Sequence, residues 1–300
     1  MCGIVGLFAK RPNIKNKLGE HISDMLEVMS DRGPDSAGVS IFKDHSPKKI
    51  KLTLHSTKPD LEFINLKKYL ASKKILESMT INYSHAVLSI DKSNKENIIL
   101  ELKEKFPNIR LISIGQKIEI YKGVGKPKSV VDNFKLRKMS GSHAVGHTRM
   151  ATESAVTTLG AHPFSTGDDQ CLVHNGSLSN HNSLRRQLIK KNMVFETEND
   201  SEVAASYLTD KMANGSNLTE ALESSLHDFD GFYTFVVGTV NGFGVLRDPI
   251  ACKPAVLAET DDYVAFGSEY RALVPLPNIE KAKVWEPEPA TVYFWGQNSE

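Results

Sequence analysis

The order of helix-like and strand-like segments in the second half of the chain constrains its fold more than any other feature. Three segments with helical apolar spacing follow one another: 180–189, 201–213 and 218–226. Five strand-like segments come after them without intervening helices: 233–239, 243–246, 255–258, 263–266 and 291–294. Consecutive strands with short connections form antiparallel sheets. The chain is therefore predicted to have a layered α+β fold and not an alternating βαβ fold.

The first 42 residues fit this scheme, whereas the next stretch has a different character. Strands are expected at 2–8 and 39–42, with a helix through Ile22 and Met29 between them. After that, helix-like and strand-like pieces alternate, as in a small α/β unit with its own core. Strands are expected at 51–55, 81–90 and 109–121, and helices at 61–74, 95–105 and 128–139. We predict a main domain formed by 2–42 and 141–300, with 43–140 as an inserted α/β subdomain.

Charge is distributed unevenly between these two parts. Residues 43–140 contain 21 Lys or Arg against 10 Asp or Glu, whereas the remainder contains 16 against 26. The basic residues are scattered, which is typical of a solvated surface; docking on an acidic partner is the alternative. Aromatic residues are sparse among them, so no nucleic-acid partner is expected.

Composition points to a soluble protein in a reducing compartment. Three cysteines cannot form a disulfide framework, and Cys171 and Cys252 are expected as small apolar residues in the core. No apolar run reaches the length of a membrane span, and no signal peptide is visible. We therefore expect a cytoplasmic protein that does not enter a membrane. The histidines and cysteines lack metal-site spacing, so no metal is expected.

Cys2 is the first candidate catalytic residue. Removal of Met1 is expected because the next residue is small, and Cys2 would then carry the α-amino group of the chain. That amine has a reference pKa of about 8 and can act as a neutral base in the cell. Thiol and base would then belong to one residue, as in N-terminal nucleophiles. The alternative is a strand cysteine that only packs.

Asn175 and Gly176 follow a strand-like segment and form a second candidate. An Asn amide and a Gly backbone N–H can both point at one oxygen and stabilise the oxyanion of a tetrahedral intermediate. A plain Asn-Gly hairpin turn is the alternative for this pair taken alone.

Arg149 and Asp200 are candidates for holding a substrate. An arginine can grip a carboxylate through two parallel hydrogen bonds, and an aspartate can pair with an ammonium group. Together they would fix both ends of an α-amino acid. A surface ion pair is the alternative for Arg149, and a helix N-cap for Asp200. Arg32 and His162 could also belong to the pocket, although both lie in segments that read as ordinary turns or loops.

The short motifs, taken together in their order along the chain, indicate a protein family more specifically than any single motif does. The chain begins Met-Cys-Gly-Ile-Val-Gly and closely resembles the class II glutamine amidotransferase family. The matching segments are Arg32-Gly33-Pro34-Asp35-Ser36, Gly146-His147-Thr148-Arg149, Ala161-His162-Pro163, His174-Asn175-Gly176 and Asp200-Ser201-Glu202. These relatives are N-terminal-nucleophile hydrolases with a four-layer αββα sandwich, and the resemblance implies that fold for the main domain.

The resemblance also implies a role for each site residue. Cys2 is expected as the nucleophile, with Asn175 and the Gly176 N–H as the oxyanion hole. Arg149 is expected to bind the glutamine α-carboxylate and Asp200 its α-ammonium. Thr152, His162 and Arg32 are expected as further pocket residues. The reaction would be hydrolysis of the side-chain amide of L-glutamine through a γ-glutamyl thioester.

Few residues follow the last matching segment, so no synthase domain is expected in this chain. The arrangement resembles the separate amidotransferase subunit of glutamate-synthase-like systems, including the N-methylglutamate synthase type. The resemblance implies a synthase partner that accepts ammonia. Any flavin or iron–sulfur cluster would belong to that partner, and no cofactor is expected in this chain. A stand-alone hydrolase of a γ-glutamyl or peptide bond and a non-catalytic regulatory subunit are the alternatives.

Overall fold

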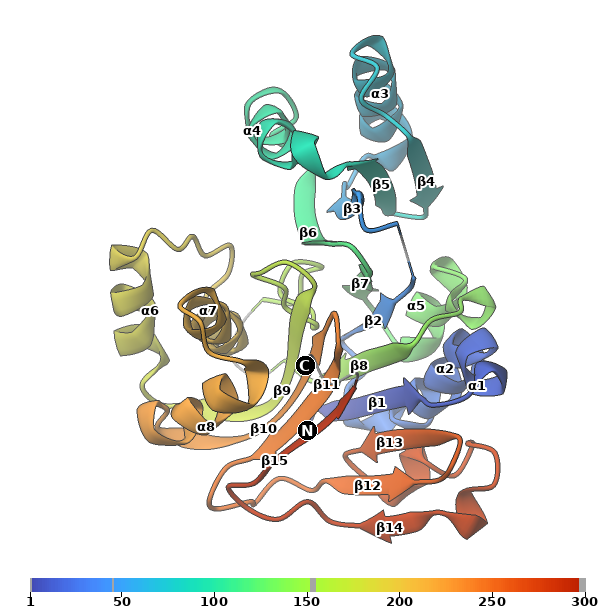
Figure 1. Ribbon diagram of the computed structural model, residues 1–300, viewed down its shortest axis with the longest axis vertical. Coiled ribbons are helices and arrows are strands. Elements are labelled where there is room, and N and C mark those ends of the chain that lie inside the picture. The colour runs from blue at the N-terminus through green and yellow to red at the C-terminus, as the bar shows by residue number, and fades with distance from the viewer. Residues whose placement is uncertain (1, 45, 152–154, 297–300) are drawn as a thin grey trace.

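Seven strands form the largest sheet, in the order β14–β12–β13–β1–β8–β2–β7 (Figure 1). The computed structural model describes residues 2–44, 46–151 and 155–296. The strands of this sheet are β1 (Gly3–Ala9), β2 (Ser36–Phe42), β7 (Ile118–Val124), β8 (His143–Arg149), β12 (Val256–Glu259), β13 (Tyr263–Gly267) and β14 (Lys283–Trp285). The first strand lies near the middle, paired antiparallel with β8 and β13. Its apolar residues are buried on both faces, which explains its continuous apolar run.

A second sheet has the order β15–β11–β10–β9. Its strands are β9 (Gln170–Leu178), β10 (Gly231–Thr239), β11 (Gly242–Arg247) and β15 (Val292–Gly296). One apolar cluster joins it to the seven-stranded sheet, with Ile4 and Val145 from the large sheet against Val236 and Phe243 from the small one. The end of β1 that carries Cys2 is therefore held close to the second sheet.

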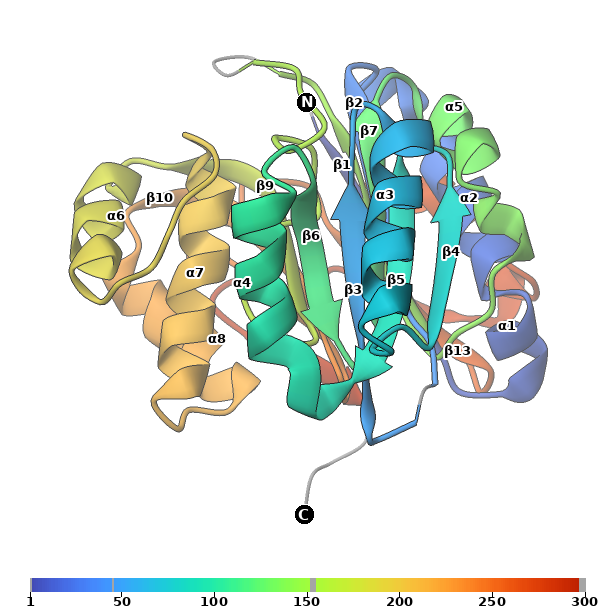
Figure 2. The same cartoon turned by 90° about the horizontal axis from the view of Figure 1, so that it is seen from above.

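Helices lie on the outer sides of these two sheets, as Figure 2 shows. On the seven-stranded sheet they are α1 (Pro12–Asn16), α2 (Leu18–Val28) and α5 (Pro127–Asn133), which share an apolar cluster with its strands. On the four-stranded sheet they are α6 (His181–Lys190), α7 (Asp200–Ala213) and α8 (Leu218–Asp228), which pack on β9 and β10. The predicted α+β class is confirmed.

The remaining elements form a separate sheet with its own core at one end of the molecule (Figure 1). Its order is β4–β5–β3–β6, and two helices complete the unit. The elements are β3 (Lys49–His55), α3 (Pro59–Ser72), β4 (Ser78–Asn82), β5 (His85–Asp91), α4 (Lys95–Lys105) and β6 (Arg110–Gly115). We call this stretch, residues 49–115, the inserted unit.

The inserted unit is shorter than the predicted range 43–140. Strand β7 and helix α5 fall inside that range, but they belong to the seven-stranded sheet and its helical cover. The single strands expected at 81–90 and 109–121 are each a pair of strands. Tyr83 turns the first pair with a φ of 54°. Apolar periodicity does not reveal such tight turns, because the strands on either side continue the same pattern.

Two local expectations were wrong, and one strand was missed. The spacing of Ile189 with Leu184 and Leu188 predicts that it points inward on α6, but it is 52% exposed. Cys252, expected in the core, is exposed, whereas Cys171 is buried as predicted. Strand β14 was not foreseen because only three residues form it. No helix in the described part of the chain is long and apolar enough to cross a membrane.

Two acidic residues tie the inserted unit to the large sheet. Asp169 accepts hydrogen bonds from the backbone N–H groups of Gln116, Lys117 and Ile118, where β6 turns into β7. Glu119 on β7 pairs with Lys51 of β3 at 3.0 Å. It also pairs with Lys43 at 2.5 Å.

The Glu119–Lys51 pair is buried, so removing either partner would leave the other as an unpaired buried charge and destabilise the fold. Burial lowers the pKa of Lys51, against the opposing effect of Glu119. Burial alone would raise the pKa of Glu119, but Lys43 and Lys51 outweigh it and hold the pKa below its usual value. The carboxylate therefore compensates two ammonium groups at once.

Replacing Glu119 by Gln tests this junction. The amide keeps the shape of the side chain but leaves the buried Lys51 without a counter-charge, which is expected to cost about 3 kcal/mol of unfolding free energy. Glu20→Gln is the control, because Glu20 makes an exposed 3.8 Å pair with Lys17 and should change stability by less than about 1 kcal/mol. Urea denaturation measures both; equal, small effects would show that the buried pair does not hold the junction.

Candidate active site

Cys2 lies at the start of β1, where the two main sheets meet. Its backbone carbonyl accepts a hydrogen bond from Arg32 Nε at 2.9 Å. The same carbonyl lies 3.4 Å from Asn175 Nδ2 on β9 of the other sheet. Its Sγ lies 3.9 Å from the carbonyl oxygen of Met150. The residue is partly exposed, so its thiol can be reached from solvent.

Arg32 fixes Cys2 rather than lining the cavity beside it. The arginine ends a short 3₁₀ turn and is buried. Besides the Cys2 carbonyl, it binds the carboxylate of Glu269, which also pairs with Arg271. Glu269 belongs to the Gly267-Ser268-Glu269 segment that follows β13. Its role could not be read from spacing, because only the fold brings it to Arg32.

A cavity of about 280 Å³ opens beside the Cys2 thiol. Five of the residues singled out from the sequence line it: Cys2, Arg149, His162, Gly176 and Asp200. The lining also includes residues that sequence reasoning did not single out: Met150, His174, Ser177, His181, Glu198, Asn199 and Ser201. A thiol, a cation and a carboxylate thus face one small volume.

Asn175 and Gly176 lie inside β9, so they do not form a hairpin turn. They pair with Thr234 and Tyr233 of β10, and the strand continues to Leu178. Gly176 has a φ of +156°. A side chain there would place its Cβ 2.0 Å from the carbonyl oxygen of Phe232. Only glycine fits this close approach, and its position keeps the strand edge open toward the cavity.

Asp200 is the first residue of α7, and Asn199 is the N-cap. The Asn199 side chain accepts from the Ser201 N–H at 2.9 Å, so the predicted capping role belongs to Asn199 rather than Asp200. Asp200 accepts from the Leu178 N–H at 3.0 Å and from Ser201 Oγ at 3.2 Å. Its place at the helix N-terminus also favours negative charge.

The electrostatics of Asp200 keep it ionised. Burial alone would raise its pKa, but His174 and the hydrogen bonds from Leu178 and Ser201 outweigh this and lower the pKa to about 2. His174 Nδ1 lies 3.6 Å from the carboxylate. The cavity therefore holds a fixed negative charge throughout the neutral pH range.

Arg149 supplies the positive charge at the end of β8. It is buried, and its Nη1 donates to the Ala155 carbonyl at 3.3 Å. Thr152, also expected in the pocket, lies outside the described residues.

Three buried histidines lie next to one another at the wall of the cavity. His162 stacks on His147 with ring centroids 4.0 Å apart, and His147 Nε2 donates to the His174 carbonyl at 3.0 Å. Burial lowers the pKa of His147 to about 3 and that of His162 well below its usual value, so both rings are neutral. Within the described structure, His162 Nδ1 and Nε2 and His174 Nε2 have no hydrogen-bond partner.

The strand positions of His147 and His174 predict structural histidines with satisfied polar atoms, whereas His162 was expected in the pocket. The open ring nitrogens show instead that the cavity wall carries unused hydrogen-bonding capacity. A buried polar group without a partner is costly, so such nitrogens favour a polar occupant. Because the Ser201 hydroxyl already donates to Asp200, it accepts a hydrogen bond from His174 Nδ1.

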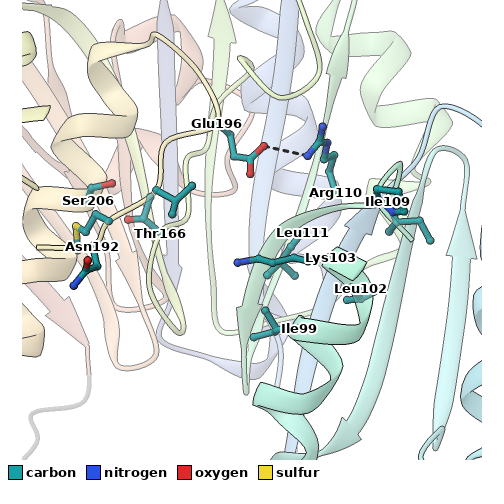
Figure 3. A pocket seen from close by; sticks show the side chains of 13 residues that line it. Ile99, Leu102, Lys103, Ile109, Arg110, Leu111, Thr166, Asn192, Glu196 and Ser206 are labelled. Carbon is teal, nitrogen blue, oxygen red and sulfur yellow. Dashed lines mark ion pairs between the residues drawn. The ribbon is translucent and has the colours of Figure 1, made fainter. Parts of the chain in front are cut away.

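A larger cavity lies elsewhere and shares no lining residue with the one at Cys2. It has a volume of about 730 Å³ and lies between the inserted unit and the segment around α6 and α7 (Figure 3). Arg110 and Glu196 face each other across it at 3.6 Å. Both side chains of this pair are exposed, and no cysteine is among the described residues that line the cavity. No group of acidic, cysteine or histidine side chains in the described residues is arranged to hold a metal ion.

The lowered pKa of Asp200 predicts a pH-dependent contribution to stability. A depressed carboxyl pKa stabilises the fold above its unfolded value of 3.8, and this stabilisation is lost as pH falls through about 2. Asp200→Asn should therefore lower the unfolding free energy by about 2 kcal/mol near pH 6, with the difference shrinking toward pH 2. Denaturant unfolding across this range measures it. A wild-type to Asn difference that stays constant with pH would contradict the assignment.

The chain is similar to proteins of one known family. A model of the glutamine amidotransferase domain matches residues 147–275. The chain is 59% identical to the glutamine amidotransferase-like protein GlxB of Rhizobium meliloti (strain 1021) over 98% of each chain. It is 32% identical to a putative glutamine amidotransferase of Methanothermobacter thermautotrophicus over 98% of this chain and 99% of the other.

A solved structure of the glutamine phosphoribosylpyrophosphate amidotransferase from B. subtilis shares the fold, with a TM-score of 0.64 and 20% identity. The match covers 98% of this chain but 47% of that one, so the chain spans about half its length. The relatives that match over their full length decide the assignment. On that similarity, the chain belongs to the glutamine amidotransferase family.

Proposed function

We propose that this chain is a class II glutamine amidotransferase subunit that hydrolyses the side-chain amide of L-glutamine through a thioester on Cys2. The observation that carries the proposal is the single cavity that joins the Cys2 thiol to the opposite charges of Arg149 and Asp200. Two facing sheets with helices outside them support the N-terminal-nucleophile hydrolase arrangement.

The charges of the cavity match the two ends of a free amino acid. Asp200, held ionised by its surroundings, is placed to pair with the α-ammonium group. Arg149 is placed to bind the α-carboxylate through parallel hydrogen bonds. Thr152 and His162 are proposed to complete the pocket. The unpartnered ring nitrogens of His162 and His174 suit a carboxamide, which both donates and accepts hydrogen bonds.

The reaction follows from the placement of Cys2. Once Met1 is removed, the α-amino group takes the thiol proton and the sulfur attacks the carboxamide carbon. The resulting oxyanion is stabilised by Asn175 Nδ2 and the Gly176 N–H. The C–N bond breaks, the amine returns the proton to the nitrogen, and ammonia leaves. Water then attacks the thioester, which releases glutamate and restores the thiol.

Asn175 already contributes before substrate arrives, because its amide lies at the Cys2 carbonyl. That contact sets the distance between the oxyanion donors and the nucleophile. Arg32 donates to the same carbonyl from the 3₁₀ turn before β2 and is proposed as a positioning residue.

We further propose that the ammonia serves a separate synthase partner of the glutamate-synthase-like or N-methylglutamate synthase type. The resemblance to stand-alone subunits supports this, as do two relatives that match this chain over almost their whole length. Flavin and iron–sulfur chemistry would belong to that partner. The presence of both Arg149 and Asp200 in the cavity favours a free amino acid over a peptide substrate, and an accessible Cys2 favours catalysis over a purely regulatory role.

Cys2→Ala is expected to abolish glutamine hydrolysis without unfolding the protein. Removal of a nucleophile typically costs about 10⁴-fold or more in kcat. Cys252→Ala is the matched control, because Cys252 is an exposed cysteine outside the cavity. Ammonia release is measured alongside circular dichroism. A folded Cys2→Ala protein with normal ammonia release would rule out the nucleophile.

Arg149→Met is expected to weaken glutamine binding more than it slows the chemical step. Loss of a charged, bidentate contact should raise KM by roughly two orders of magnitude with a smaller change in kcat. Arg186→Met removes an exposed arginine on α6 and serves as the control. Steady-state glutaminase kinetics separate the two parameters; an unchanged KM would remove Arg149 from the carboxylate site.

A further inference from the structure

Residues 159–163, here called the pocket loop, are fastened to the large sheet by one side chain. Lys122 lies on β7 and is 4% exposed. Its Nζ donates to the carbonyl of Ala161 at 2.7 Å. It also donates to those of Leu159 at 3.1 Å and Pro163 at 3.2 Å. The carbonyl groups of every second residue in this short segment thus bind one ammonium group.

The surroundings of Lys122 are shaped for this contact. Its Nζ also lies 4.9 Å from the ring centroid of Phe164, just after the loop. On the neighbouring strand, Gly38 leaves room for the loop. A Cβ on Gly38 would lie 2.2 Å from the His162 carbonyl oxygen and 2.5 Å from Lys122 Cβ. The loop therefore docks against β2 and β7 at a site where β2 carries no side chain.

The pocket loop connects Lys122 to the cavity at Cys2. His162, whose flanking carbonyls both bind Lys122, lines that cavity. Gly160 packs beside Arg149, since a Cβ there would lie 3.5 Å from Arg149 Nη1. A shift of the loop would therefore move one wall of the cavity and the neighbour of its cationic group.

We propose that Lys122 is a positioning residue of the glutamine pocket, which holds the pocket loop so that His162 and Arg149 face the substrate. The inference rests on the proposed glutaminase activity. Lys122 touches neither substrate nor nucleophile and acts through the loop. It lies within the range 43–140 that was expected to form the insertion, where no motif marked it.

The charge state of Lys122 matters because only the ammonium form donates three hydrogen bonds; the neutral amine donates two. Burial lowers its pKa to about 7, while Glu202 on α7 acts in the opposite direction. The other titratable groups that face it are His162 of the loop and His55 and His85 of the inserted unit, each with a lowered pKa. Glutamine binding should therefore weaken as pH rises through about 7.

Lys122→Met tests the proposal against Lys51→Met. Both lysines are buried on strands, but Lys51 binds Glu119 and the Lys117 carbonyl, away from the loop. Loss of the loop contacts should raise KM for glutamine by about tenfold or more with a smaller effect on kcat. Lys51→Met should leave KM within about twofold even if it lowers the melting temperature. Equal KM values for the two variants would overturn the proposal.

Lys122→Arg distinguishes a positioning role from a merely structural one. A guanidinium stays charged across the assay range, so this variant should recover a low KM and lack the rise of KM between pH 6.5 and 8.5 that is expected for the wild type. Lys122→Met should have a high KM at every pH. Identical pH profiles of KM for all three proteins would contradict the proposal.

Hydrogen exchange provides a readout that does not depend on activity. In Lys122→Met, amides of the pocket loop should exchange faster than in the wild type, while those of β3 and β5 keep their rates. If exchange is faster in Lys122→Met but the wild type has no glutaminase activity, the proposed function would be wrong, whereas the contact between Lys122 and the pocket loop would be supported. Unchanged exchange in a folded Lys122→Met protein would disprove the role of Lys122 itself.

Discussion

The backbone carbonyl of Cys2 is the point on which the site depends. Arg32 reaches it from the 3₁₀ turn that precedes β2, and Asn175 reaches it from the four-stranded sheet. The two contacts to this one oxygen therefore fix the position of the nucleophile relative to β9, the strand that carries the oxyanion donors. The apolar cluster between the two sheets keeps this position rigid, because a close-packed interior resists small displacements of one sheet against the other. Movement of either sheet would separate the thiol from Asn175 and Gly176.

Around this point, the cavity brings an arginine and an ionised aspartate together with neutral histidines. Arg149 is buried, the pKa of Asp200 is lowered to about 2, and the lowered pKa values of His147 and His162 keep both rings neutral. Such an arrangement favours an occupant that brings one charge of each sign and polar hydrogens. A free amino acid with a side-chain amide meets all three conditions. Lys122 likewise binds three carbonyl groups of the pocket loop through one buried ammonium group.

The sequence predicted the elements whose signals are local. Cys2, Gly176 and Asp200 were singled out from short motifs, and the structure brings them to one cavity. The interior position of Asn175 in β9 was not predictable, since Asn-Gly reads equally well as a turn. Glu269 and Lys122 were missed because their partners lie 237 and 37 to 41 residues away. Strand β7 was misplaced for a related reason: periodicity shows that a strand exists, not which sheet it joins.

The most direct test of the account is the intact mass of the protein before and after treatment with a glutamine analogue that carries a diazoketone in place of the carboxamide. The account predicts a chain that lacks Met1 and gains a single adduct, which fragmentation places on Cys2. Excess glutamine should slow the labelling, because both molecules compete for the same charges. A chain that remains unlabelled, or carries the adduct on Cys171 or Cys252, would contradict the assignment of Cys2 as the nucleophile of a glutamine site.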